Sequence, residues 1–274
     1  MKTIRYFLLS LLLVTPSLLM AAPKVVVSTK PLHSLVTGLM DGVATPTLLA
    51  NRQETLTESD KLTLITADMI IWVGPGFDKQ LAQLTTHQLP GIQDNMFALS
   101  HHLPLLPKQG IDLTQVADPE NRQAHRNLAF WMDPKLAAMA VRRMALKLSL
   151  LDPDNTEQYL NNEIKMVARI KALGDELSTI LAPMTGEHRS IELGHDYLSW
   201  RFKLKPYEQD NLLAADLDAV HQCQNLMQVN NTNPPASAQD IYFEMMKQQA
   251  NARVKCFPKP RTAENTEQRQ RAAT

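Results

Sequence analysis

The stretch MIIWVGPGF, residues 69–77, decides the fold class of this chain. Five apolar residues in a row, from Met69 to Val73, are typical of a short strand that is buried on both faces. Gly74-Pro75-Gly76 then ends the run, because glycine and proline interrupt regular strands. A strand of this kind belongs to a sheet that helices cover on both sides, so helical periods are expected before and after it.

Strands and helices do alternate on both sides of this stretch. Short β-branched or apolar runs predict strands, and apolar residues at a spacing of three or four predict helices. Strands are predicted at residues 24–28, 47–50 and 96–99, and helices at 32–41, from Ser59-Asp60 onward, and at 77–84. Strands separated by helix-length connections indicate a parallel α/β sheet, whose ligands meet the loops beyond the carboxyl ends of the strands.

The second half of the chain is dominated by helical patterns. Residues 100–126 are polar and aperiodic and are predicted to form a loop, after which Pro134 opens a helix. The next apolar period, at 153–182, predicts a helix on the order of 45 Å long, enough to cross from one lobe to another. Beyond it we predict strands at 190–194 and 254–257, a helix at 236–252 between them, and a disordered tail at 258–274.

The amino terminus has the order of a secretory signal peptide. Lys2 and Arg5 precede an apolar run, and Ala21-Ala22 follows, with cleavage expected near Ala21. A membrane anchor is the alternative, but the run is shorter than the roughly 20 apolar residues that a membrane span needs. We therefore predict export to the periplasm with residues 1–21 removed.

The charge and the absence of known catalytic motifs argue against nucleic-acid binding and against catalysis. Removal of two basic residues leaves 26 basic against 28 acidic residues, a formal charge of about −2, whereas nucleic-acid surfaces are normally basic. There is no zinc-protease helix motif, no nucleophile elbow and no phosphate-binding glycine loop, so we predict that the chain is not an enzyme. Cys223 and Cys256 favour a disulfide in an exported protein, with two free buried thiols as the alternative.

Several stretches, in order, resemble the periplasmic solute-binding protein of the high-affinity zinc-uptake ABC transporter. They are VVVSTKPLHSLVTGLMDGVATPTLL from Val25, ADMIIWVGPGFDKQL from Ala67, NLAFWMDP from Asn127 and SAQDIYFEMMKQQANARVKCF from Ser237. The resemblance implies two α/β lobes with parallel sheets joined by a long rigid helix, with zinc held between the lobes by three histidines and an acidic group or water. The lobes would be residues 22–133 and 183–257, connected by 134–182, and the second lobe would be incomplete.

The metal ligands of that family are only partly present. The family's first histidine lies in a loop after the second strand, where this chain has the shorter, histidine-free ANRQETLTESD (residues 50–60). The second histidine precedes the tryptophan of NLAFWMDP by two residues, and that position is Ala129. The third begins a His-Asp pair in the second lobe, which His195-Asp196 matches. The resemblance therefore assigns one ligand, His195, and predicts weakened or lost zinc binding.

Other histidines could replace the missing ligands. His101-His102 lies where many members carry a histidine-rich segment, and His125 precedes Ala129 by four residues. A relocated site from His125, His195 and one of that pair is one alternative, and solvated loop histidines are the other. His33, on a predicted helix, is interpreted as structural. Methionines could bind copper, but those on helices more commonly fill cores.

Two functions follow from these observations. In the first, the chain captures a divalent metal, zinc by resemblance, and delivers it to an ABC transporter membrane permease. In the second, it is a degenerate paralogue that acts in the periplasm as a metal-independent interaction protein. We also expect a monomer that does not bind nucleic acid.

Overall fold

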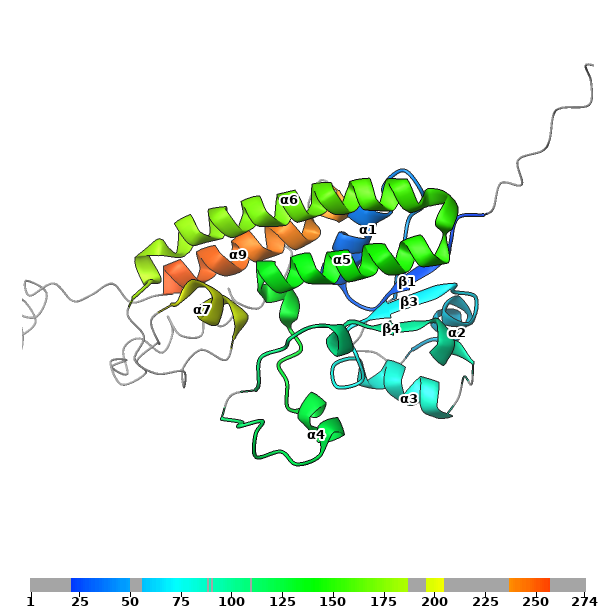
Figure 1. Ribbon diagram of the computed structural model, residues 1–274, viewed down its shortest axis with the longest axis horizontal. Coiled ribbons are helices and arrows are strands. Elements are labelled where there is room, and N and C mark those ends of the chain that lie inside the picture. Colours follow the sequence, from blue (N-terminus) through cyan, green and yellow to red (C-terminus); the bar gives the residue numbers. More distant parts are fainter. Residues whose placement is uncertain are drawn as a thin grey trace, which may run out of the picture.

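The computed structural model describes residues 21–49, 56–87, 89, 91–108, 110–186, 196–204 and 237–256. Its sheet has four parallel strands in the order β2-β1-β3-β4, which confirms the predicted parallel α/β sheet. Figure 1 shows β1, β3 and β4 beside one another. The strands are β1 (Val25–Val27), β2 (Thr47–Leu48), β3 (Met69–Trp72) and β4 (Met96–Ala98). The connecting helices are α1 (Lys30–Leu39), α2 (Glu58–Ile65) and α3 (Lys79–His87).

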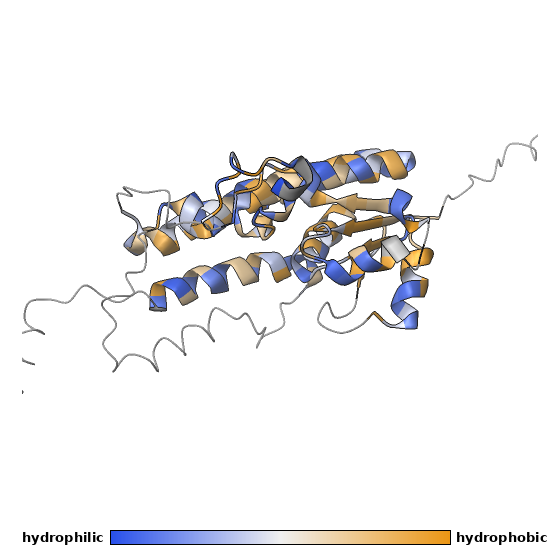
Figure 2. Cartoon of the chain, turned by 90° about the horizontal axis from the view of Figure 1, so that it is seen from below, coloured by the Kyte–Doolittle hydropathy of each residue, from blue (hydrophilic) through white to orange (hydrophobic). Residues whose placement is uncertain are grey.

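Alternation along the strands divides the core between the two faces of the sheet. Val26, Ile70 and Trp72 point to the side covered by α2 and α3. Val25, Val27 and Ile71 belong to the larger cluster on the opposite side. Because successive side chains of a strand point to opposite faces, a run that is apolar at every position needs helices on both. Figure 2 shows the apolar strands between the helices.

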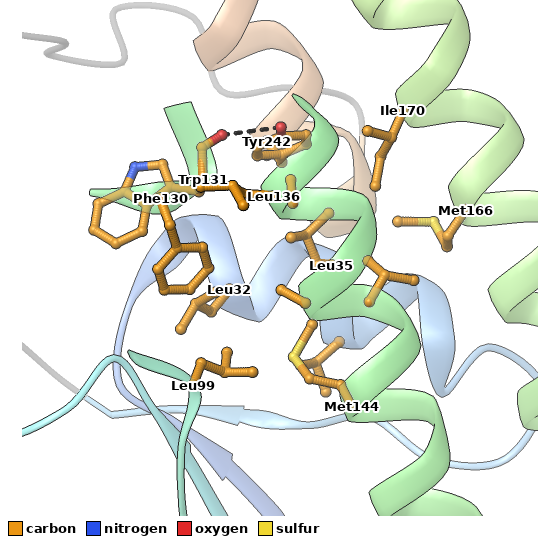
Figure 3. Close-up of a cluster of buried hydrophobic side chains, with 14 of the residues drawn as sticks. Leu32, Leu35, Leu99, Phe130, Trp131, Leu136, Met144, Met166, Ile170 and Tyr242 are labelled. Carbon is orange, nitrogen blue, oxygen red and sulfur yellow. Dashed lines mark hydrogen bonds between the residues drawn. The ribbon is translucent and has the colours of Figure 1, made fainter. Parts of the chain in front are cut away.

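Long helices cover the side of the sheet that carries the larger hydrophobic cluster. They are α5 (Pro134–Leu151), α6 (Thr156–Leu181) and α9 (Ile241–Cys256), and α6 packs against both α5 and α9. Figure 3 shows how Leu32 and Leu35 from α1, Met144 from α5 and Met166 from α6 meet in one buried cluster. The predicted long helix is therefore present, although its first residues, Pro153–Asn155, form a 3-10 turn.

A buried asparagine and a glycine allow α6 to pack closely on α1. Asn162, 2% exposed, donates from Nδ2 to the carbonyl oxygens of Leu39 (3.0 Å) and Asp41 (2.7 Å), so it satisfies orphan groups at the end of α1. One turn away, Gly38 lies against Met166, and a Cβ at Gly38 would clash with the Met166 Sδ. The two helices are therefore closely interlocked.

The prediction of a strand at 254–257 was wrong. Residues 254–256 are the last turn of α9, whose apolar residues Tyr242, Met246, Ala250 and Val254 recur every four positions. This helical period outweighs the strand preference of a short Val-Cys-Phe segment. The other predicted strand, at 190–194, lies outside the described residues, as does the tail.

Smaller elements differ from the predictions at their ends. Thr57, not Ser59-Asp60, caps α2: its Oγ1 accepts from the Asp60 N–H (3.2 Å) while Asp60 Oδ2 accepts from the Thr57 N–H (2.8 Å). The predicted loop at 100–126 contains the short helix α4 (Pro119–Ala124). The 3-10 turns are η1 (Ile92–Asn95), η2 (Leu99–His102), η3 (Phe130–Met132), η4 (Pro153–Asn155), η5 (Ala182–Met184) and η9 (Ala238–Asp240).

Within the second lobe predicted at 183–257, the structure describes residues 183–186, 196–204 and 237–256, which include α7 (Tyr197–Phe202) and α9. No helix in the described ranges is long and apolar enough to cross a membrane.

Candidate metal centre

The carboxyl ends of the strands are tied together by short contacts. Asp78, 6% exposed, accepts at Oδ2 from the Ser28 Oγ (3.1 Å) after β1 and from the Val73 N–H (3.0 Å) after β3. Gly74 has a φ of +140°, and a Cβ there would clash with the Ser100 Oγ. This edge of the sheet is thus a compact surface on which the 127–133 segment packs.

The segment 127–133 holds Ala129 in a fixed backbone conformation. Asn127 Oδ1 accepts a hydrogen bond from the Ala129 N–H at 3.0 Å. Trp131, 8% exposed, lies edge-on to the rings of Phe77 (5.1 Å) and Phe130 (5.5 Å). Asn127 and Trp131 therefore have structural roles that do not depend on a metal. The Ala129 methyl group between them has no atom that can bind one.

Helix α7 docks directly on this segment. The Tyr197 hydroxyl donates to the Asn127 carbonyl oxygen (2.7 Å) and accepts from the Leu106 N–H (3.2 Å). Burial, with a smaller contribution from the Asp133 charge, raises the pKa of Tyr197 to about 12, so the hydroxyl keeps its proton at neutral pH. The first turn of α7 is therefore held against Asn127, which precedes Ala129 by two residues in the sequence.

An ion pair makes a second connection between α7 and the segment. The Arg201 guanidinium binds the Asp133 carboxylate through Nε (2.7 Å) and Nη2 (2.6 Å). Asp133 is only 1% exposed, and its Oδ1 also caps α5 by accepting from the Lys135 N–H (2.8 Å). One carboxylate therefore fixes both the start of α5 and the position of α7.

His195, the ligand assigned by resemblance, lies outside the described residues, but its neighbour Asp196 is described. Asp196 Oδ1 accepts from the Ser199 N–H (3.1 Å) as the cap of α7, and the carboxylate pairs with Arg253 of α9 (2.9 Å). Burial acts to raise the pKa of Asp196, but the Arg253 charge and the bonds from Ser199 together hold it below the usual value. Asp196 is thus engaged in fixing the start of α7.

The alternative histidines have other surroundings. His102 is exposed and its ring stacks on Phe97, with centroids 4.8 Å apart. Partial burial, followed by the charges of His101, Arg143 and Lys147, lowers the pKa of His102. The same positive charges also disfavour a bound cation.

His125 is half-buried, and its carbonyl oxygen accepts from the Lys108 N–H at 2.7 Å. Within the described ranges, no three His, Cys, Asp or Glu side chains are grouped as a metal site requires. The relocated site includes His195 and therefore remains a prediction. His33 Nε2 bonds the Pro46 carbonyl oxygen (3.0 Å), a contact that links α1 to the chain before β2.

The sequence of this chain matches the family described as "Zinc-uptake complex component A periplasmic" over residues 25–211. The chain belongs to this family. It is 26% identical over 221 residues to the high-affinity zinc uptake system protein ZnuA of Yersinia pestis, covering 73% of this chain and 69% of that protein. The zinc-uptake component A family consists of transport binding proteins rather than enzymes, and its members bind a divalent metal that they deliver to an ABC permease.

Solved structures show the same fold. The periplasmic zinc-binding protein TroA of Treponema pallidum matches with a TM-score of 0.61 and 14% identity, covering 86% of this chain and 99% of that one. A manganese-bound periplasmic metal-binding protein of Candidatus Liberibacter asiaticus matches with a TM-score of 0.58 and 14% identity, covering 83% and 98%. These likenesses confirm the α/β fold with a parallel sheet.

Sequence reasoning did not find the residues that join α7 to the segment 127–133. Tyr197 and Arg201 are four positions apart and thus lie on one helix face, which is a recognisable signal. Their partners, the Asn127 carbonyl and Asp133, become evident only when the chain is folded.

Proposed function

We propose that this chain serves a divalent-metal ABC uptake system in the periplasm and holds its metal much more weakly than family members with three histidines. The observation that carries the proposal is Ala129. Its N–H donates to the Asn127 Oδ1, and Trp131, two residues on, packs against Phe130, yet the Ala129 side chain offers no ligand atom. The resemblance makes position 129 a ligand position, and an alanine there supports the proposal of weakened binding.

The expected loss can be estimated from the number of ligands. Zinc sites in proteins are usually four-coordinate. If a complete site contributes roughly 10–16 kcal/mol, each ligand accounts for about 3 kcal/mol. Two missing histidines then cost about 6 kcal/mol, or roughly four orders of magnitude in affinity. His195 alone cannot supply high affinity.

The test is calorimetric titration of zinc into the mature chain and into Ala129→His. The unmodified chain should bind zinc at least about a thousandfold more weakly than a three-histidine member. Ala129→His should raise affinity by no more than about 3 kcal/mol, because the loop at residues 50–60 still lacks its histidine. Ala129→Ser, which adds a polar side chain without an imidazole, is the matched control and should bind like the parent.

Adding His195→Ala to Ala129→His should remove the gain. If the unmodified chain binds zinc at nanomolar strength and His195→Ala leaves that unchanged, the assignment of His195 is wrong. His101, His102 and His125 would then be the ligands to test.

One observation favours the second candidate function, a metal-independent interaction protein. The Tyr197 contact with Asn127 and the Arg201 contact with Asp133 join the two parts of the chain without any metal. A lobe arrangement that these contacts maintain could be recognised by a permease whether or not metal is bound. Co-purification of the permease should then be equal with zinc and with a chelator, whereas a transport role requires a difference between the two.

A further inference from the structure

Four side chains that carry or can take up a positive charge gather around one aromatic ring at the edge of the sheet. The ring is that of Phe97 in β4, the last strand in the sheet order. The imidazole of His102 stacks on this ring with centroids 4.8 Å apart, and the Lys147 Nζ of α5 lies 5.5 Å from the ring centroid. His101 precedes His102 in the turn η2. Arg143 precedes Lys147 by four residues, so the two share a face of α5.

No carboxylate balances these four groups within the described parts of the chain. None of the four forms an ion pair with a residue that the structure describes. The charges that act on His102 come from His101, Arg143 and Lys147, and each of them is positive. Like charges that lie together in a folded chain repel one another and cost stability. A group of opposite charge that binds there relieves this repulsion.

The four groups form an open surface. All of them are exposed, whereas Phe97, on which two of them lie, is buried. Sites for small ligands are concave and enclose most of the ligand surface, which exposed side chains on one turn and one helix do not. A partner with several negative charges can contact all four groups at once. Such simultaneous contacts add up, although each exposed ion pair is weak by itself.

We propose that His101, His102, Arg143 and Lys147 form a docking surface for an acidic segment of a partner protein, a stretch with several Asp or Glu side chains. Its carboxylates pair with the arginine and the lysine, which are charged at every physiological pH, and with the two histidines when these are protonated. Segments that bind membranes combine basic residues with apolar side chains that enter the bilayer, but the aromatic ring at the centre of this surface is buried. The surface does not include the assigned ligand His195, so the proposal does not depend on zinc affinity.

The two histidines make this docking surface more positive in mild acid. The groups that face His102 are His101 from its own turn, Arg143 and Lys147 from α5, and the uncharged ring of Phe97. A carboxylate that binds beside an imidazole favours its protonated form. Binding therefore takes up protons and tightens as the histidines become charged, between about pH 7.5 and pH 5.5. Aspartate side chains of the partner stay ionised over this range.

The test is a titration of the mature chain into a fluorescent peptide of about ten aspartates at pH 7 and low salt, followed by anisotropy. The parent chain should bind the peptide. Arg143→Gln with Lys147→Gln should weaken binding about tenfold, because two charge contacts are lost. The matched control is Lys165→Gln with Lys171→Gln, which removes the same charge from exposed positions of α6. The control should bind within about twofold of the parent, and circular dichroism should show that both variants are folded.

His101→Gln with His102→Gln gives a second measurement that leaves α5 unchanged. Between pH 7.5 and pH 5.5, binding by the parent should tighten several-fold, whereas binding by this variant should stay nearly constant. The proposal is overturned by a parent that does not bind the peptide, by a control that loses as much affinity as the Arg143 and Lys147 variant, or by a pH dependence that survives without the histidines. Binding to vesicles of anionic phospholipid without binding to the peptide would overturn it as well.

Discussion

The buried pair of Asp133 and Arg201 should be worth far more than a surface ion pair of the same length. Asp133→Asn tests this, since an asparagine oxygen can still accept from the Lys135 N–H and keep the cap of α5. The same oxygen keeps the bond from Arg201 Nε, but the amide nitrogen takes the place of Oδ2 and cannot accept from Arg201 Nη2, and the ionic attraction is lost. Removing one partner of a buried pair costs about 3–5 kcal/mol, and because Arg201 is 21% exposed and can reach water, we expect about 2–3 kcal/mol.

Arg201→Met should be the more damaging change. It keeps much of the aliphatic stem but leaves the Asp133 carboxylate, 1% exposed, with the Lys135 N–H as its remaining bond among those described above. A buried charge left without its counter-ion cannot be solvated, so we expect about 3–5 kcal/mol. The double variant should lose less than the sum of the two, because no unpaired charge remains.

Urea unfolding of the four proteins, followed by circular dichroism, gives the free energies and the coupling between the two residues. The matched control is Asp240→Asn, which breaks the Arg169–Asp240 pair. That pair has the same 2.6 Å separation, but its side chains are 40% and 36% exposed, so its loss should cost less than about 1 kcal/mol. If Asp133→Asn costs no more than Asp240→Asn, or the coupling is under about 1 kcal/mol, burial does not set the strength of these pairs and the reasoning fails.

Two further predictions concern residues between 196 and 256. Cys223 lies outside the described residues and nothing is described of the Cys256 side chain, so their disulfide remains a prediction: closing a loop of about 33 residues should contribute roughly 3–4 kcal/mol, and mass spectrometry of periplasmic material that finds two free thiols would exclude it. The pKa of Asp196 is lowered in the folded chain, so its stabilising effect is present above its unfolded pKa of about 3.9 and is lost as pH falls through the lower folded value. Asp196→Asn, which keeps the cap of α7, should therefore be less stable than the parent at pH 7 and become equal to it in strong acid; a difference in unfolding free energy that persists there would contradict this.

The sheet could be predicted from the sequence because each strand carries its own signal. The apolar run from Met69 to Val73 requires cover on both faces, and the segments between strands are long enough for crossover helices. The strand predicted at 254–257 failed because four residues are too few to distinguish periods of two and four. Seen together with Tyr242, Met246 and Ala250, Val254 belongs to a helix.

Part of the candidate site could also be predicted from the sequence, and part could not. The absence of a ligand at Ala129 follows from the sequence once the neighbouring Asn127 and Trp131 are recognised. The docking of α7 does not, because Tyr197 and Arg201 contact residues about 70 positions earlier in the chain. Contacts of that range depend on how the helices pack, and no local pattern encodes their geometry.

The contacts between α1 and α6 lie near one end of the long helix, so a change there is expected to have its largest effect at the other end. Asn162 and Met166 hold α6 at the end of α1, and from Met166 to Leu181 the helix extends about 22 Å further. A rotation of about 10° at the contact with Gly38 displaces Leu181 by about 4 Å, given that length. Helix α9 packs along α6, and Arg253 at its far end binds Asp196, so this displacement reaches the residue next to His195. A substitution at Gly38 or Met166 that shifts α6 is therefore expected to act on Asp196, beside the assigned ligand His195, without altering that ligand.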